Sequence, residues 1–547
     1  MTRSRQISFL GSGMLLFLVC LGCGSGSNFE AAVTPTASPL VAKYTLVIPP
    51  QGAVAWVEFG QDLNYGRQTA MTAATTSPNQ TVNMVVAGMK PSTTYHLRSH
   101  VTWGGDQSWV SQDQTFTTGA LPTLAGMDPN LKVPYVTMPK ITVTRPTPNL
   151  TPSSGVEMFS LVTPSNILLS AIVTDLEGNV IWYYYPAKPG LSTVPIRMMT
   201  NGHFLIHLSD LLEVDLEGNV VRDINVNQIN KSLQAKGYDF QIINFHHDVI
   251  ILPNGHWITL ANTIKQYTNL VGFPGAGPLT GCTPANSNLW TCNVLGDDLI
   301  DIDTNGNVAW AWSGFEQGLQ TGLDINRHLQ TASLIPNTLD WTHSNAIVYT
   351  ADHNLLLSMR HQSWVLKIDY QDGKGAGDIM WKLGWEGDFA IAGGDTTDWF
   401  YAQHFPHLET TNGSGSQMTL AVFDNGNLRV AGNGQDCAVP FSPTSAATAT
   451  CYSRATRFDV DETSMVATPT WQYPTGFYSW WGGSIGTLSN GDLEFDMATV
   501  AGPPASEVME ITSDDAPKKV WQLNVAGANA YRAYRIPSLY PGVTWQD

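Results

Sequence analysis

The fold of this chain is decided by the stretch VTDLEGNVIW at residues 173–182, because related stretches return along the sequence. The stretch combines a short apolar strand that reaches an Asp, a turn with Gly and Asn, and a second strand with an aromatic residue. Clear copies occupy residues 214–221 and 302–310. Three weaker copies begin with KID at 367–369, RFD at 457–459 and EIT at 510–512, and each leads to a Trp. The sequence therefore holds six repeated units.

A second element, an Asn-Gly-type turn followed by an apolar strand, alternates with the first. Its copies lie at residues 200–206, 253–258, 352–357, 412–420 and 489–495. Two hairpins per unit give four antiparallel strands per unit, which is typical of a β-propeller. We therefore predict an all-β fold with a six-bladed β-propeller over residues 156–547. The spacing of the units, from 40 residues (Asp175 to Asp215) to 90 (Asp369 to Asp459), predicts long insertions at one mouth of the channel.

The region before the propeller has a different pattern. Residues 40–120 alternate apolar and polar positions between turns, which predicts further β-strands. KPSTTYHLRS at 90–99 and QTFTTG at 114–119 resemble the end of a fibronectin type III sandwich. We expect this small domain to dock or space the propeller. Residues 121–155 are rich in Pro, Thr and Ser and are expected to form a linker or wrapping segment.

The N-terminus predicts export. Residues 1–23 read as a signal peptide, with Arg3 and Arg5 before an apolar stretch, and 24–39 as a linker. Cys23, followed by Gly and Ser, predicts a lipoprotein-type site; ordinary cleavage nearby is the alternative. We expect a periplasmic or cell-envelope protein that meets the membrane only through this lipid, since no other apolar run approaches the roughly 20 residues of a spanning helix.

Four cysteines remain in two local pairs, and an oxidising compartment favours their closure as disulfides. The expected pairs are Cys282 with Cys292 and Cys437 with Cys451. Neither pair has the C-x2-C spacing of a zinc site.

The chain is acidic, with a formal net charge of -18 and only 27 Lys plus Arg residues. This balance argues against a nucleic-acid partner, because phosphate binding needs a basic surface. A cation among several histidines in such a chain points instead to a small anion as ligand.

Three histidines fall in register when the Asn-Gly-type turns are aligned: His246, His343 and His404. Each begins the strand that would line the central channel, so the three are expected to share one pocket. Residues i and i+2 share a strand face, which places Asn345 beside His343 and Asp248 beside His246. His247 would face the other way unless a bulge intervenes. Either His246 or His247 remains a candidate.

Arg360 lies at the end of the next strand of the His343 unit, and His361 is expected to face away from it as a structural residue. A single His on a strand is most often structural, but three in register with an Arg are not needed for stability. Imidazoles also suit a metal such as zinc, copper or iron. Near a cation, Arg360 would repel the charge and Asn345 would occupy space that a ligand could fill. Arg and neutral imidazoles instead suit an oxyanion. We therefore expect no metal.

Several motifs in order resemble the bacterial arylsulfate sulfotransferases, a family that does not use the nucleotide sulfate donor. They are HHD at 246–248, THSN at 342–345, SMRHQS at 358–363, QH at 403–404, FDNG at 423–426 and YRA at 531–533. The resemblance covers roughly residues 155–547, and it implies a six-bladed propeller preceded by a sandwich.

The resemblance also implies ping-pong transfer from a phenolic sulfate ester to a phenolic acceptor, without cofactor. His404 would be the nucleophile that carries the sulfuryl group. His343, Asn345, Arg360 and one of His246 or His247 would hold the sulfuryl oxygens and help to protonate the leaving group. Arg532 and Asp248 are assigned to substrate binding.

Two other functions compete with this one. The first alternative is a noncatalytic propeller lipoprotein that binds a ligand or scaffolds a complex, and the second is a metal-dependent hydrolase or lyase. The sequence leaves the natural substrates and the oligomeric state open, a homodimer included.

Overall fold

The computed structural model describes residues 29–47, 52–74, 81–186, 196–207, 209–271, 281–286, 289–315, 335–427, 429, 451–500 and 504–546. The expected signal peptide with Cys23, and Cys437, lie outside these residues. No helix in the described part of the chain is long and apolar enough to cross a membrane.

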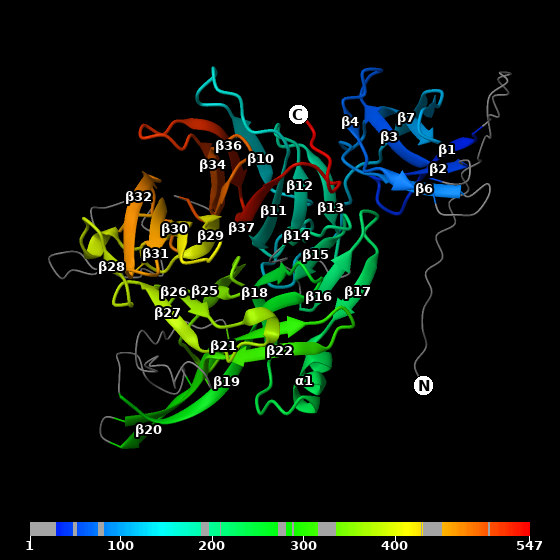
Figure 1. The fold of residues 1–547 in the computed structure, drawn as a ribbon. Helices are drawn as coiled ribbons and strands as arrows, with labels where there is room; N and C mark the ends of the chain where they lie inside the picture. Colours follow the sequence, from blue (N-terminus) through cyan, green and yellow to red (C-terminus); the bar gives the residue numbers. More distant parts are fainter. Residues whose placement is uncertain are drawn as a thin grey trace, which may run out of the picture.

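Six β-sheets form the propeller, so the predicted fold class and number of blades are confirmed (Figure 1). Blade 1 contains β11 (Val156–Thr163), β12 (Ala171–Thr174), β13 (Val180–Tyr184) and β37 (Asn529–Ile536). Blade 2 contains β14 (Ile196–Met198), β15 (Phe204–His207), β16 (Leu211–Val214) and β17 (Val220–Ile224), and the helix α1 (Val226–Ala235) follows it.

Blade 3 contains β18 (Asn244–Ile251), β19 (Trp257–Val271), β21 (Leu289–Ile302) and β22 (Val308–Ser313), with β20 (Cys282–Asn286) and β23 (Leu339–Asp340) at its sides. Blade 4 contains β24 (Ser344–Tyr349), β25 (Leu355–Met359), β26 (Trp364–Ile368) and β27 (Ile379–Gly384). Blade 5 contains β29 (His404–Thr411), β30 (Gln417–Asp424), β31 (Arg454–Asp461), β32 (Val466–Pro474) and β28 (Ala390–Ile391). Blade 6 contains β33 (Ser484–Thr487), β34 (Leu493–Met497), β35 (Ala505–Ile511) and β36 (Lys519–Ala526).

The repeated Asp-to-Asn turn joins two outer strands of a blade. The Asp175 carboxylate accepts the backbone N–H groups of Glu177 and Asn179 at 3.1 and 2.8 Å. Gly178 has φ +84, a backbone region that disfavours side chains. The turn chemistry therefore ends one strand and starts the next at a fixed place in each unit.

The aromatic residues of the repeat connect neighbouring blades. The indole N–H of Trp182 in blade 1 donates to the carbonyl of Leu216 in blade 2 at 3.0 Å. Trp521 in blade 6 donates to Leu176 in blade 1 at 2.9 Å, which closes the ring by the same contact. The same kind of contact joins blades 3 and 4, where Trp312 donates to Gly377 O at 2.9 Å.

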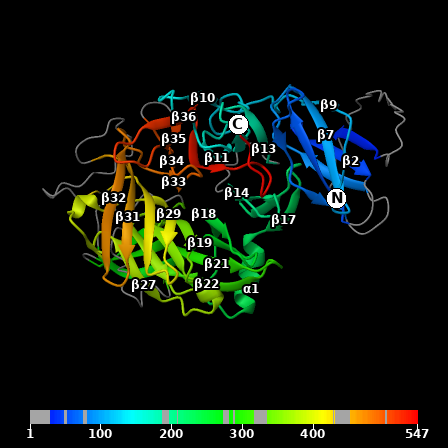
Figure 2. The same cartoon turned by 45° about the horizontal axis from the view of Figure 1, so that its top comes forward.

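The C-terminus closes the ring a second time. β37 pairs with β11 as the innermost strand of blade 1. This explains why the sequence has six Asp units but five Asn-Gly-type elements: blade 1 takes its inner strand from the other end of the chain. β10 (Lys140–Thr144), within the expected linker 121–155, pairs with β36 and so wraps onto blade 6. Figure 2 shows the inner strands gathered around the centre.

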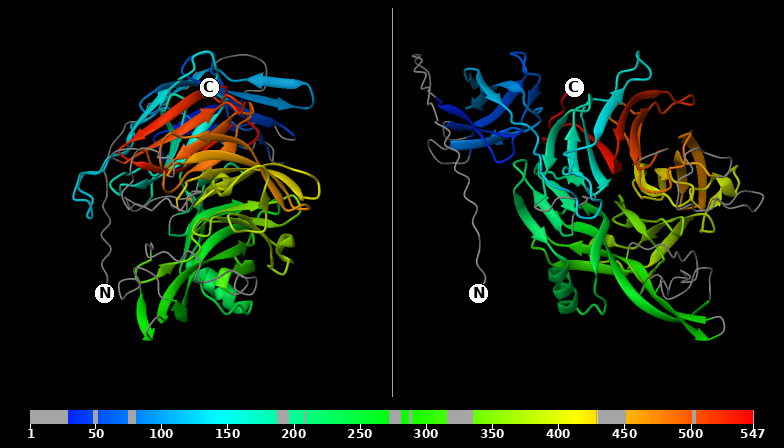
Figure 3. Two further views of the ribbon diagram at one scale, coloured as in Figure 1. Left: turned by 90° about the vertical axis from the view of Figure 1, so that its left-hand side faces the viewer. Right: turned by 180° about the vertical axis from the view of Figure 1, so that it is seen from behind.

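One insertion extends blade 3 well beyond its neighbours. β19 and β21 form a long hairpin that projects from the ring (Figure 3). Cys282 on β20 pairs with Cys292 on β21 in a disulfide, as predicted. Cys451 is also disulfide-bonded, although its expected partner lies outside the described residues.

Two antiparallel sheets form the N-terminal sandwich. One contains β1 (Ala31–Pro35), β2 (Ala42–Val47) and β6 (Thr81–Val86). The other contains β3 (Val54–Gly60), β4 (Arg67–Gln68), β5 (Thr72–Ala73), β7 (Thr94–Trp103), β8 (Gln107–Val110) and β9 (Gln114–Thr117). β1 lies within the expected linker 24–39, so the sandwich starts earlier than its alternating pattern suggested.

The C-terminal segment fastens the sandwich to the propeller. Trp545 is buried against Phe59, with 5.8 Å between ring centroids, and its indole N–H donates to the carbonyl of Gln68 at 3.0 Å. The Tyr540 hydroxyl donates to Val85 O at 2.8 Å. One apolar core runs from the sandwich into blades 1 and 2 through these residues.

We expect Trp545→Ala to destabilise this junction by about 3–5 kcal/mol, since it removes a buried indole and leaves a cavity. The measurement is urea unfolding followed by circular dichroism. Leu63→Ala, at a side chain that is 64% exposed, serves as the control and should change stability little. Equal midpoints for the two variants would contradict a fastening role for Trp545.

Candidate active site

The polar residues selected from the sequence gather at the inner ends of blades 3, 4 and 5. His246, His247 and Asp248 lie on β18, His343 directly precedes β24, Asn345 lies on β24, Arg360 directly follows β25, and His404 begins β29. β24 contacts both β18 and β29, so the three blades bring their histidines together. β37 adds Tyr531 and Arg532 from the C-terminal end.

All three histidine-bearing strands are irregular where the histidines lie. Pairing shifts occur between His246 and Val249 in β18, after Ser344 in β24, and after His404 in β29. The backbone has positive φ at His247, His343 and Phe405, namely 50, 48 and 46. Such bulges turn side chains away from strict alternation.

The bulge in β18 brings both of its histidines into the cluster. The Nδ1 atoms of His246 and His247 lie 2.8 Å apart. The His247 ring lies 4.9 Å from the His343 ring. His247 therefore joins the site, because the bulge that its participation requires is present.

His404 is held in one tautomer by Asn425. The amide nitrogen of Asn425 donates to the carbonyls of Ser479 and Gly482 at 2.7 and 3.0 Å, so its oxygen is the atom that faces His404. That oxygen lies 2.7 Å from His404 Nδ1, which must therefore carry the proton. Nε2 keeps its lone pair, to which the Gly482 N–H donates at 3.3 Å.

Burial lowers the pKa of His404 well below its ordinary value, and the charge of Arg360 lowers it further, although the Asn425 hydrogen bond acts in the opposite direction. The imidazole is thus neutral at neutral pH. A buried, oriented and neutral imidazole with a lone pair is a nucleophile that needs no deprotonation.

Arg360 lies in the turn after β25, and its guanidinium is held at two points. Nη2 donates to the Trp480 carbonyl at 2.8 Å, and Nη1 lies 3.0 Å from His361 Nε2. Within the described residues, Nε of Arg360 and the hydroxyl of Tyr478 are buried without a hydrogen-bond partner. These two unsatisfied donors belong to side chains that interact with each other, as expected of a site that receives an anion.

His361 does not face away from Arg360, which corrects the expectation from strand alternation. Both residues belong to the turn between β25 and β26, where alternation does not apply. The His361 ring lies 4.6 Å from the His343 ring, so His361 also belongs to the cluster.

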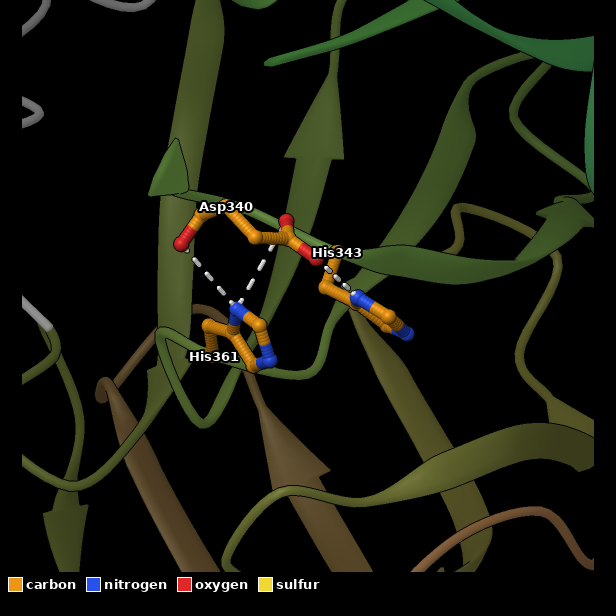
Figure 4. Close-up of side chains that lie close together, drawn as sticks. All are labelled: Asp340, His343 and His361. Atoms are coloured by element: carbon orange, nitrogen blue, oxygen red, sulfur yellow. Dashed lines mark hydrogen bonds and ion pairs between the residues drawn. The ribbon is translucent and has the colours of Figure 1, made fainter. Parts of the chain in front are cut away.

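Asp340 lies between these two imidazoles (Figure 4). His343 Nδ1 lies 2.5 Å from Asp340 Oδ2. His361 Nδ1 lies 3.3 Å from the Asp340 carbonyl and 3.7 Å from Oδ1. The carboxylate thus fixes Nδ1 of His343 as the protonated nitrogen and leaves Nε2 for the cluster.

The same three side chains offer donor atoms within 4.8 Å of one another, which is close enough for a metal ion. Two observations favour the hydrogen-bonded arrangement. His343 Nδ1 and Asp340 Oδ2 are already joined by a hydrogen bond, and the Arg360 guanidinium contacts His361. A cation here would meet a positive charge.

A second carboxylate, Asp297 on β21, supports the histidines of β18. Asp297 Oδ1 lies 3.2 Å from His246 Nε2, and the Nδ1 atom of His246 lies 2.8 Å from that of His247. Although burial alone would raise the pKa of Asp297, the neighbouring His246, Thr342 and Ser344 lower it. His246 therefore lies between Asp297 and His247.

Burial lowers the pKa of His247 well below its ordinary value, and the neighbouring His343, His246 and His404 and the Arg532 charge lower it further. His247 is neutral at neutral pH. A small cavity of about 40 Å³ lies beside His247 and His343, on the side of Asp297 and Asp340.

Asn345 and Asp248 are occupied by protein groups. The Asn345 amide donates to Gln403 O at 2.7 Å and accepts from Phe405 N at 3.4 Å, so it holds the backbone on both sides of His404. Asp248 pairs with Arg532 at 3.1 Å and Arg197 at 2.9 Å. These residues lie around the site and position it, which differs from the expected contacts with substrate oxygens.

Tyr531 forms an aromatic side of the site. Its ring lies 6.0 Å from His404 and 5.7 Å from His247, and it stacks on Trp481 at 6.3 Å. The sequence reading assigned no role to Tyr531, Trp481, Asn425, Asp297 or Asp340. Asn425 lies within the FDNG motif and Asp340 lies three residues before His343, whereas Asp297 is distant from every selected residue in sequence.

Fold and site together define a propeller protein with a polar centre in which several imidazoles lie close to the Arg360 and Arg532 guanidiniums. The chain belongs to the arylsulfotransferase (ASST) family, whose sequence pattern matches residues 147–273 and 285–535. Membership supports aryl sulfotransferase activity in general.

No curated protein matches this chain. Among solved structures, a catalytically inactive virginiamycin B lyase from Staphylococcus aureus, determined with quinupristin, is similar over 71% of this chain and 100% of its own. The two are 10% identical, with a TM-score of 0.27.

Proposed function

We propose that this protein transfers a sulfuryl group from a phenolic sulfate ester to a phenolic acceptor through a sulfohistidine at His404. The observation that carries the proposal is the fixed tautomer of His404. Asn425 holds the proton on Nδ1 at 2.7 Å, so the lone pair lies on Nε2, where the 3.3 Å hydrogen bond from the Gly482 N–H is given up as sulfur approaches.

In the first half-reaction the Nε2 lone pair attacks sulfur, and the bond between sulfur and the aryl oxygen breaks. Charge moves to the leaving oxygen, to which protonated His343 gives its Nε2 proton. Arg360 and the Gly482 N–H stabilise the sulfuryl oxygens during transfer, as preorganised donors do for other oxyanions.

In the second half-reaction the acceptor oxygen attacks the same sulfur while neutral His343 takes the phenolic proton. The bond between sulfur and Nε2 breaks, and the electron pair returns to His404. Both half-reactions balance without a metal or cofactor, since the proton lent by His343 in the first is recovered in the second.

The aromatic group of Tyr531, stacked on Trp481, is the surface that would contact the phenyl ring of donor or acceptor. Offset or edge contacts between rings favour aryl over alkyl sulfates. We further propose export and lipidation at Cys23, to be checked by the mass of the mature N-terminal peptide.

The activity is tested by incubating the protein with 4-nitrophenyl sulfate, with and without phenol. We expect phenol to accelerate nitrophenol release and phenyl sulfate to form, and chelator to leave the rate unchanged. Correctly folded protein that releases nothing with any acceptor would favour a noncatalytic binding protein. Loss of activity on chelation would favour the metal-dependent alternative.

A further inference from the structure

We propose that Asp340 is a positioning residue that makes His343 the imidazole which carries the proton in both half-reactions. The inference rests on the proposed function and deepens it. Its basis is the contact between Asp340 Oδ2 and His343 Nδ1 at 2.5 Å, with the carboxylate 3% exposed and the imidazole 16% exposed.

The contact separates His343 from the other histidines of the cluster. His404 Nδ1 faces a neutral amide, and His247 Nδ1 faces another imidazole. Only His343, among these three, has a carboxylate directly on its Nδ1. A carboxylate at this place stabilises the doubly protonated imidazole by a charge-assisted hydrogen bond. His343 is therefore suited to hold a second proton at Nε2.

Other charged and titratable groups face His343 from the neighbouring elements. His361 lies 4.6 Å away, ring to ring, and His247 lies 4.9 Å away. His404 also interacts electrostatically with His343, and the Arg360 and Arg532 guanidiniums act on His404, so positive charge is already present in the cluster. Asp340 is the nearest group that compensates this charge.

Asp340 also helps to position the Arg360 guanidinium, through the imidazole of His361. His361 Nδ1 faces the Asp340 carbonyl at 3.3 Å, which directs His361 Nε2 toward Arg360 Nη1 at 3.0 Å. Asp340 thus contacts both His343 and His361 (Figure 4), and through His361 it orients the Arg360 guanidinium.

The test is Asp340→Asn in the full-length protein, assayed with aryl sulfates whose phenols range from acidic (4-nitrophenol) to weakly acidic (4-methylphenol). A weakly acidic phenol needs protonation as it leaves. We expect a small loss with 4-nitrophenyl sulfate and a loss of about 10²- to 10⁴-fold with 4-methylphenyl sulfate. An equal loss with every donor would overturn the proposal.

A second readout does not depend on activity. Selective ¹⁵N labelling of histidine reports the tautomer of His343, whose resonance is assigned with His343→Gln. We expect a proton on Nδ1 of His343 in all molecules of the unaltered protein, whether or not Nε2 is also protonated, and on only part of the Asp340→Asn molecules, because an amide can either donate or accept. An unchanged tautomer would overturn the positioning role, while absence of transfer by the unaltered protein would instead contradict the proposed function.

The matched control is Asp301→Asn. Asp301 is also buried and lies 2.9 Å from the Nδ1 atom of a histidine, His256, but this pair lies outside the site. The control variant should keep both the dependence on the leaving phenol and the His343 tautomer. A shift of either in Asp301→Asn would mean that loss of any buried carboxylate produces the effect.

Discussion

Replacing His404 by Ala is expected to lower kcat for aryl transfer by roughly 10⁴- to 10⁶-fold, the range seen when a nucleophile is removed. The imidazole is the single group that bonds to sulfur in both half-reactions, so neither step survives its loss. The measurement is acceptor-dependent nitrophenol release at saturating 4-nitrophenyl sulfate.

His407→Ala provides the matched control on the same strand. His407 pairs with Ala421 on β30, and its charged neighbours are Glu409, Arg197 and Arg457 rather than the histidine cluster. This variant should keep most of its activity. A comparable loss in both variants would point to damage of β29 and not to removal of a nucleophile.

The same pair of proteins can be examined for the covalent intermediate. Donor without acceptor should add the mass of one sulfuryl group to the peptide that contains His404. The addition should be absent from His404→Ala and should disappear when phenol is supplied. A label on another histidine would reassign the nucleophile.

The pKa of His404 determines the pH dependence of this step. Because burial and Arg360 lower that pKa well below 6.5, the neutral nucleophilic form persists when the pH falls through 6.5. The first burst of nitrophenol should therefore be retained there and lost only as the pH falls through the lowered value. A burst that titrates near 6.5 would contradict the burial of His404.

Much of the fold was predictable because local sequence features define its strands and turns. The Asp-to-Asn turn fixes where strands end, and period-two alternation marks strand faces. Both features act within a few residues, so six units could be counted. The sequence also contains a sign of the ring closure, since one of the six units lacks an Asn-Gly-type element. That sign can be interpreted only when β37 is seen to supply the inner strand of blade 1.

The sequence predicted which residue types form the site better than it predicted how these residues are arranged. Alternation placed His247 and His361 away from the cluster, or left them undecided, because it assumes a regular strand. His247 has φ 50 and His361 lies in a turn, and both conditions depend on contacts between blades that a single sequence does not reveal.

The supporting carboxylates were missed for a related reason. Asp297 contacts His246 across 51 residues of chain, on a strand that belongs to a long insertion hairpin. Asp340 is three residues from His343, and this short spacing was the available signal. Asn345 and Asp248 were correctly placed near the site by their i+2 spacing, whereas their partners, Gln403 O and Arg532, come from other blades.

Arg360→Ala is expected to give the second large effect, a loss of about 10²- to 10³-fold in kcat, which is typical when a preorganised donor to developing charge is removed. The guanidinium is 9% exposed and fixed by Trp480 and His361, so it does not have to reorganise as the sulfuryl group moves. Steady-state kinetics with 4-nitrophenyl sulfate and phenol provide the measurement.

Arg360→Lys separates charge from geometry, because an ammonium keeps the charge but lacks the rigid planar fork with which the guanidinium contacts Trp480 and His361. We expect it to recover substrate binding more than kcat.

Arg145→Ala, at a side chain that is 46% exposed in an ion pair with Glu177, controls for the loss of one positive charge and should leave kcat and KM unchanged. If Arg360→Lys restored full kcat, charge alone would account for catalysis at this position. If Arg360→Ala raised KM with kcat intact, Arg360 would bind the ground state and the transition state equally, and the stabilisation of the transferring group would have to come from His343 and the Gly482 N–H.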